Sequence, residues 1–67
     1  MSLYPLPMRF PASYAHVDIA VTPDGWTFAT DADADNFGEL PTAERLELRS
    51  AFEAQVALAK RDAALGA

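Results

Sequence analysis

The sequence predicts an α+β fold, in which a small antiparallel sheet of two or three strands packs against one long C-terminal helix. Three observations support this prediction. The stretch from Thr42 to Leu65 contains neither proline nor glycine, and its apolar residues recur with helical spacing. Residues 14–30 alternate apolar and polar side chains around a Pro-Asp-Gly turn, as a β-hairpin does. The chain has no cysteine, so helix and hairpin must cover each other without disulfide support.

Length and charge limit the kind of protein this is. A chain of 67 residues predicts a single domain over residues 1–67, which buries only about 60% of its unfolded surface and would benefit from a partner. Ten acidic and five basic residues give a net charge of −5, which opposes direct binding to nucleic acid. The sequence has no signal-peptide pattern and no apolar run long enough to span a membrane. We therefore expect a cytoplasmic protein that does not bind membranes.

The proline-rich segment 1–13 allows two interpretations. Its prolines, at positions 5, 7 and 11, are compatible with an irregular, polyproline-like arm. They also share one parity, while the apolar residues of the other parity are Tyr4, Leu6, Met8 and Phe10. In an edge strand, all the missing N–H donors would then lie on the outer edge, and residues 6, 8 and 10 would pair with the hairpin. Arm and edge strand both remain open at this point.

The hairpin should consist of strands at residues 15–21 and 26–30, joined by a turn in which Gly25 adopts positive φ. A four-residue loop gathers the apolar side chains on one face of the hairpin, whereas a three-residue loop mixes polar and apolar side chains on both. Burial favours the first register. That register pairs Val21 with Trp26 and Ile19 with Phe28.

Residues 31–41 are predicted to form an acidic connector that reverses the chain from sheet to helix, with Phe37 and Leu40 anchoring it to the core. Its aspartates alternate as at the start of a calcium-binding loop; they are Asp31, Asp33 and Asp35. The calcium pattern then fails, because it requires glycine where the chain has Asn36 and glutamate where it has Thr42. A solvated connector is the expectation, with weak cation binding as the alternative.

The helix is predicted over residues 42–65, with Thr42 as N-cap and Glu44 near the positive end of the helix dipole. At about 100° per residue, one stripe of the helix should face the core. Its members are Leu48, Ala51, Phe52, Gln55, Val56, Ala59 and Ala63, with Leu58 on the margin. The residues expected to face away are Arg49, Glu53, Lys60 and Arg61.

Catalytic chemistry has little support in the sequence. His16 is the only histidine and lies two residues from Asp18, a pairing that can perform acid–base chemistry. No serine lies in a motif typical of a nucleophile, and a domain of this size has little room for a buried pocket. We therefore predict no enzyme, no metal and no cofactor, and interpret His16 as a surface or partner-facing residue.

The predicted function is a small acidic protein-binding module, either an inhibitor of the kind that phages and mobile elements encode or an accessory subunit. Its partner is expected to be another protein with a basic surface. The alternatives are a structural homo-oligomer packed through its helices and an acidic mimic of nucleic acid. The residues predicted to contact the partner are Asp31, Asp33, Asp35, Glu39, Leu46, Leu58 and His16.

Overall fold

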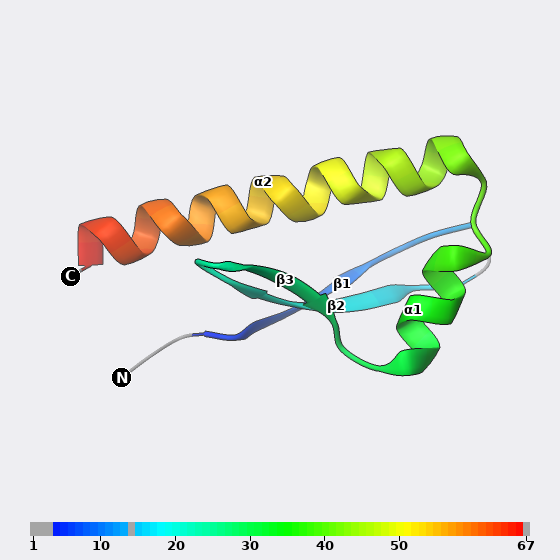
Figure 1. The fold of residues 1–67 in the computed structure, drawn as a ribbon, viewed down its shortest axis with the longest axis horizontal. Coiled ribbons are helices and arrows are strands. Elements are labelled where there is room, and N and C mark those ends of the chain that lie inside the picture. The colour runs from blue at the N-terminus through cyan, green and yellow to red at the C-terminus, as the bar shows by residue number, and fades with distance from the viewer. Residues whose placement is uncertain (1–3, 14, 67) are drawn as a thin grey trace.

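The computed structural model describes residues 4–13 and 15–66 and has the predicted α+β architecture. Three strands form one antiparallel sheet in the order β1-β2-β3; they are β1 (Leu6–Phe10), β2 (Val17–Thr22) and β3 (Gly25–Phe28). A short helix, α1 (Asp31–Gly38), follows the sheet and precedes the long helix α2 (Thr42–Gly66). Helix α2 lies across one face of the sheet, and α1 lies at the end of the molecule where β3 stops (Figure 1).

The proline-rich segment contains an edge strand, which decides between the two interpretations left open by the sequence. Leu6, Met8 and Phe10 of β1 lie opposite Val21, Ile19 and Val17 of β2, respectively. Pro7 lies opposite Ala20 and is exposed to solvent. Because proline lacks an N–H, the outer edge of β1 is poorly suited to pairing with a further strand. Residues 1–3 of the predicted arm and Tyr14 of the predicted hairpin lie outside the described residues.

The hairpin has the predicted register, with Val21 opposite Trp26 and with Ile19 opposite Phe28. Both strands extend one residue further into the turn than predicted, because Thr22 pairs with Gly25. They are shorter than predicted at their other ends, since β2 begins at Val17 and β3 ends at Phe28. The Thr22 hydroxyl accepts hydrogen bonds from the backbone N–H groups of Asp24 and Gly25, both at 3.2 Å. This side-chain support organises the turn with Gly25 at negative φ, so the prediction of positive φ at Gly25 is wrong.

The predicted acidic connector is instead largely helical, and this is the main correction to the sequence-based fold. Thr30 is the N-cap of α1: its hydroxyl accepts from the Asp33 N–H at 3.2 Å. The Asp33 carboxylate in turn accepts from the Thr30 N–H at 3.1 Å, which completes a capping box. Phe37 and Leu40 pack against the core as predicted. Local capping therefore turns this polar stretch into a helix.

Helix α2 begins at Thr42 and ends at Gly66, one residue beyond the predicted end. Thr42 is the first helical residue, not the N-cap, because the Pro41 carbonyl already accepts from the Arg45 N–H at 3.0 Å. The Thr42 hydroxyl accepts from Arg45 Nη2 at 3.0 Å and leaves the backbone of the first turn uncapped. The first turn is held from outside the helix: Glu44 accepts hydrogen bonds from the Ser13 hydroxyl and, at 2.8 Å, from the Ser13 N–H.

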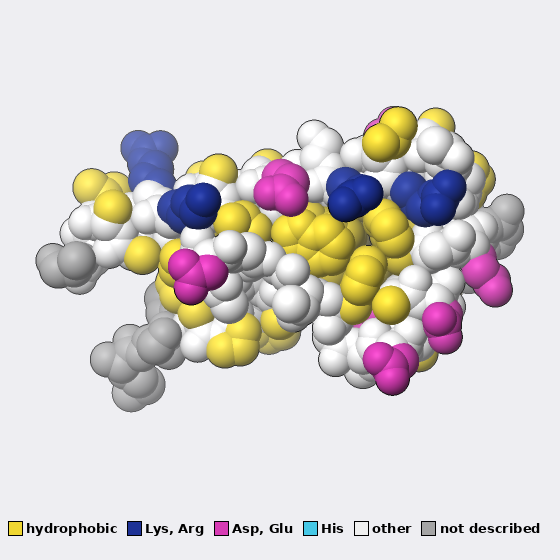
Figure 2. Space-filling model, viewed as in Figure 1, with side chains coloured by type: hydrophobic (Ala, Val, Ile, Leu, Met, Phe, Trp, Pro, Cys, Tyr) yellow, Lys and Arg dark blue, Asp and Glu magenta, His cyan; other side chains and the backbone are white. Residues whose placement is uncertain are grey.

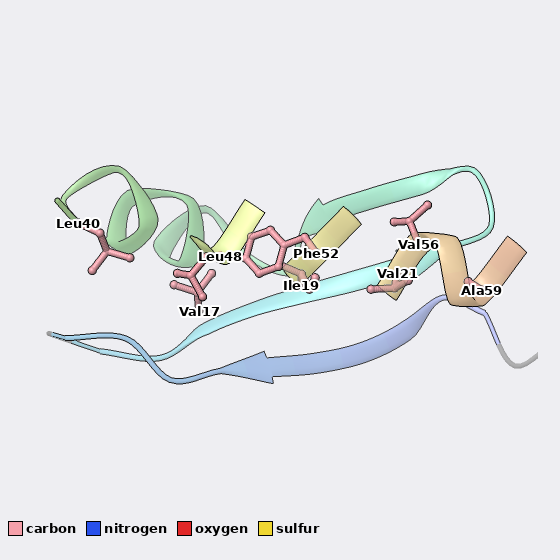
Figure 3. Packing of buried hydrophobic residues seen from close by; sticks show 8 residues of the cluster. All are labelled: Val17, Ile19, Val21, Leu40, Leu48, Phe52, Val56 and Ala59. Carbon is pink, nitrogen blue, oxygen red and sulfur yellow. The ribbon is translucent and has the colours of Figure 1, made fainter. Parts of the chain in front are cut away.

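The core lies between α2 and the sheet (Figure 3) and is centred on Phe52, which is fully buried. The Phe52 ring contacts the rings of Phe10 and Trp26 at centroid distances of 4.9 and 4.6 Å. The buried apolar residues are Val17, Ile19, Val21, Leu40, Leu48, Phe52, Val56 and Ala59. The predicted helix stripe is confirmed as far as Ala59, but Ala63 is exposed, because α2 runs beyond the core at its C-terminal end.

Candidate functional site

The acidic side chains of α1 separate into two groups. Asp31, Asp35 and Glu39 are exposed, and Figure 2 shows acidic side chains gathered over this end of the molecule. In a helix, residues two apart do not face each other, so Asp33 points away from Asp31 and Asp35. Within residues 4–13 and 15–66, no cluster of three or more histidine, aspartate or glutamate side chains could hold a metal ion.

Asp33 is turned into the fold rather than towards a partner. Its side chain is only 6% exposed, and its carboxylate accepts from the Asp18 N–H at 3.0 Å and from the Thr30 hydroxyl at 2.6 Å. The Thr30 hydroxyl bond is the largest cause that lowers the pKa of Asp33, followed by the bond from the Asp18 backbone. Asp33 thus joins the start of α1 to strand β2, and its ionised form stabilises that junction.

His16 lies directly before β2 and is exposed. Asp33 of α1 accepts from the backbone N–H of Asp18, which lies two residues after His16. Asp33 is occupied by hydrogen bonds from Thr30 and Asp18. The carboxylate near His16 therefore acts as a structural acceptor, and His16 remains available to solvent or a partner.

The two leucines predicted to contact a partner do not form one patch. Leu46 and Leu58 are 63% and 51% exposed, but their positions on α2 lie about 120° apart around the helix axis. Leu46 lies beside Phe37 at the junction of the two helices. There, a pocket of about 260 Å³ is lined by Phe37, Thr42, Arg45, Leu46 and Arg49, and we call it the α1–α2 pocket.

A strip of half-buried aromatic rings continues from this pocket along the sheet. Phe37 lies 5.3 Å from Phe28, and Phe28 lies 5.0 Å from Trp26, between ring centroids. The Trp26 indole N–H donates to Glu53 of α2 at 3.2 Å. We call these three rings the aromatic strip. Figure 2 shows apolar side chains between helix and sheet on this face, with basic side chains of α2 directly above them.

Sequence reasoning did not find this surface. The sequence predicts that Trp26 and Phe28 lie on the apolar face of the hairpin, that Phe37 anchors the connector to the core, and that Arg49 faces away from the core. The available signal was the spacing of Arg45 and Arg49, which lie one helical turn apart on the flank next to the Phe52 stripe. Their proximity to Phe37 depends on α1 being a helix, and that element was missed.

The opposite face of the sheet carries an exposed cross-strand ion pair. Arg9 and Asp18 lie opposite each other in β1 and β2, and two hydrogen bonds of 2.9 and 3.3 Å join the guanidinium to the carboxylate. The hydrogen bond to Asp18 raises the pKa of Arg9. A shallow pocket of about 250 Å³ adjoins the pair, lined partly by Pro7 and Ala29. Because Arg9 is mostly exposed, the pair adds little stability.

Comparisons with known proteins identify no family for this chain. No protein-family model, no curated protein and no solved structure matches the chain. Among the described residues, no helix has the length and apolar character needed to cross a membrane. The candidate site comprises the aromatic strip, the α1–α2 pocket and the exposed carboxylates of α1.

Proposed function

We propose that this chain is a protein-binding module that acts as an inhibitor or accessory subunit through surface contacts. One observation carries the proposal: the aromatic strip and Leu46 are partly or largely exposed on one face, bordered by arginines of α2 and carboxylates of α1. Partly exposed aromatic residues next to arginine are common anchors of protein interfaces.

The charge of the α1 face sets the kind of partner. Asp31, Asp35 and Glu39 are exposed, and none of them forms an ion pair within residues 4–13 and 15–66. Carboxylates without cationic neighbours attract a basic surface and accelerate its approach, while apolar contacts hold it after docking. The partner is therefore a protein with a basic surface facing α1.

The experiment is affinity capture from the native host with the full chain as bait. The matched control is the D31N/D35N/E39Q variant, which keeps the size of each side chain and removes the three charges. The wild-type chain should retain a specific protein that the neutral variant retains poorly, and the difference should shrink at high salt. If neither bait retains a specific protein, the proposal is contradicted.

A homo-oligomer is the second candidate, because the far side of α2 also carries uncovered apolar side chains. Leu58 and Leu65 are 51% and 75% exposed and lie on nearly the same side of the helix. Sedimentation velocity on the purified chain tests this candidate: it predicts a discrete dimer or tetramer at micromolar concentration that L58E disrupts. A monomer at every concentration would remove it.

A further inference from the structure

Strand β3 has a free edge that is equipped to pair with another strand. In the order β1-β2-β3, β3 is an outer strand, and the Ala29 N–H donates to the Asp18 carbonyl at 2.9 Å. The backbone N–H and C=O groups of successive residues alternate between the two edges of a strand. Those of Thr27 therefore also face β2, whereas those of Trp26 and Phe28 face away from it. Within the described residues, the outward N–H and C=O groups of Trp26 and Phe28 have no hydrogen-bond partner.

The other outer strand lacks this capacity. Pro7 of β1 removes a backbone donor, and the flanking Pro5 and Pro11 are exposed as well. Helix α1 lies beyond the end of β3, where Asp33 accepts from Asp18 of β2 and Phe37 contacts Phe28. None of the residues Gly25–Phe28 is fully buried, and Thr27 is exposed. The sheet can therefore be extended on the β3 side only, and by a segment of about four to six residues.

The side chains of an added strand would meet the aromatic strip and then the α1–α2 pocket. Trp26 and Phe28 direct their rings to the helix side of the sheet, since both contact residues of the helices. An adjacent strand lies about 4.8 Å away, so every second side chain of the added segment would lie against these rings. The segment that follows the strip reaches Phe37, where the pocket begins.

The charges of the pocket favour an acidic side chain. Arg45 and Arg49 are like charges one turn apart, and neither contacts a carboxylate within residues 4–13 and 15–66. Glu53, the next acidic residue on that flank, is engaged by the Trp26 indole. Two guanidinium groups beside the apolar side chains of Phe37 and Leu46 suit a carboxylate on an aliphatic stem.

We propose that β3 binds an extended segment of the partner protein as a fourth strand, and that an aspartate or glutamate of this segment lies between Arg45 and Arg49. The proposal rests on the protein-binding function and names its docking site. The acidic face of α1 and the arginines of the pocket then select a partner that presents charges of both signs.

The test uses a displayed library of random seven-residue peptides, selected on the full chain, followed by synthetic peptides with blocked termini. Trp26 is the only tryptophan, so its fluorescence reports binding at the strip. Enriched peptides should carry one acidic residue and apolar residues at alternate positions. Changing that acidic residue to its amide should raise Kd about tenfold, as should R45Q/R49Q. The two changes together should add little, because they remove one interaction.

Two controls make the geometry specific. K60Q removes a positive charge from the same flank of α2 and should leave Kd unchanged. Peptides methylated on the alternate backbone nitrogens that face β3 should no longer bind. Peptides methylated on the other alternate nitrogens, which face solvent, should bind as before. Absence of enriched peptides, indifference to R45Q/R49Q, or equal tolerance of both methylated sets would overturn the proposal. A dimer of the free chain that peptide binding dissociates would assign the edge to a second copy and also overturn it.

Failure of this site is distinguishable from failure of the proposed function. If the wild-type chain and R45Q/R49Q capture the same host protein equally well, the protein-binding function stands and the β3 site is wrong. If the wild-type chain captures no specific protein while the selected peptides bind as described, the edge site stands and the partner surface on α1 is wrong.

Discussion

Two acidic residues stabilise this fold through hydrogen bonds that their sequence context does not predict. Asp33 is the clearest case: it belongs to a run of exposed carboxylates, yet it accepts hydrogen bonds from β2 and from the α1 cap. Glu44 performs a similar task at the other helix, where it accepts from Ser13. Both have lowered pKa values for this reason.

The lowered pKa of Asp33 predicts a pH dependence of stability. The stabilisation is fully present above the unfolded-state pKa, about 3.9, and is lost as pH falls through the lower folded-state pKa. Asp33→Asn should therefore lower the melting temperature at pH 7 and flatten its dependence on pH below about 5. Asp35→Asn, at an exposed position, is the control. Identical pH profiles for the two variants would contradict the role of Asp33.

Phe52 predicts the largest loss of stability from a single truncation. Its ring is fully buried between sheet and helix and contacts three other aromatic rings. Phe52→Ala should cost about 3 to 5 kcal/mol in the free energy of unfolding, measured by chemical denaturation. Arg49→Ala, on the exposed flank, should stay within about 0.5 kcal/mol. Similar losses for both variants would place the wrong face of α2 in the core.

At the level of elements, the sequence predicted the helices and strands whose buried apolar residues recur at regular intervals. Helix α2 and the hairpin register follow from apolar side chains that recur with the period of one element, because a displaced register would expose them. Helix α1 has no such pattern, since the one residue that it buries is the polar Asp33. The sequence signal for α1 is the Thr30–Asp33 capping box, whose two reciprocal hydrogen bonds are local. The residues around it also favour turns, so the signal was not recognised.

The two threonines that precede or begin helices should respond differently to the same substitution. Thr30 caps α1 through its hydroxyl, whereas the Thr42 hydroxyl contacts only the Arg45 side chain. Thr30→Ala should cost about 1 kcal/mol and lower the amide-exchange protection of α1 more than that of α2. Thr42→Ala should have a much smaller effect. Hydrogen exchange measured by NMR checks both; a larger loss at Thr42 would reverse the cap assignment.

Across the whole molecule, the candidate site adjoins the core, because Trp26 and Phe37 of the aromatic strip both contact Phe52. The core ends at Ala59, where the helix carbonyl also accepts from the Tyr4 hydroxyl at 3.5 Å. The candidate site was only partly predictable from sequence, because it combines β3, α1 and α2, and the pocket at Phe37 exists only once α1 has formed. Of the predicted contact residues, Leu46 lies in that pocket, whereas Leu58 lies on another side of α2.

Removal of the last turns of α2 should separate fold from association. Residues 60–66 are all exposed, so a chain ending at Lys60 loses no buried apolar side chain. Its free energy of unfolding should differ from that of the full chain by less than about 1 kcal/mol, measured by denaturation with urea. Peptide binding at β3 should be unchanged, because Arg45 and Arg49 lie at the opposite end of the helix. If the full chain is an oligomer held by Leu65, truncation should yield a monomer in sedimentation velocity. Cooperative unfolding lost on truncation would instead show that the distal turns belong to the folded core.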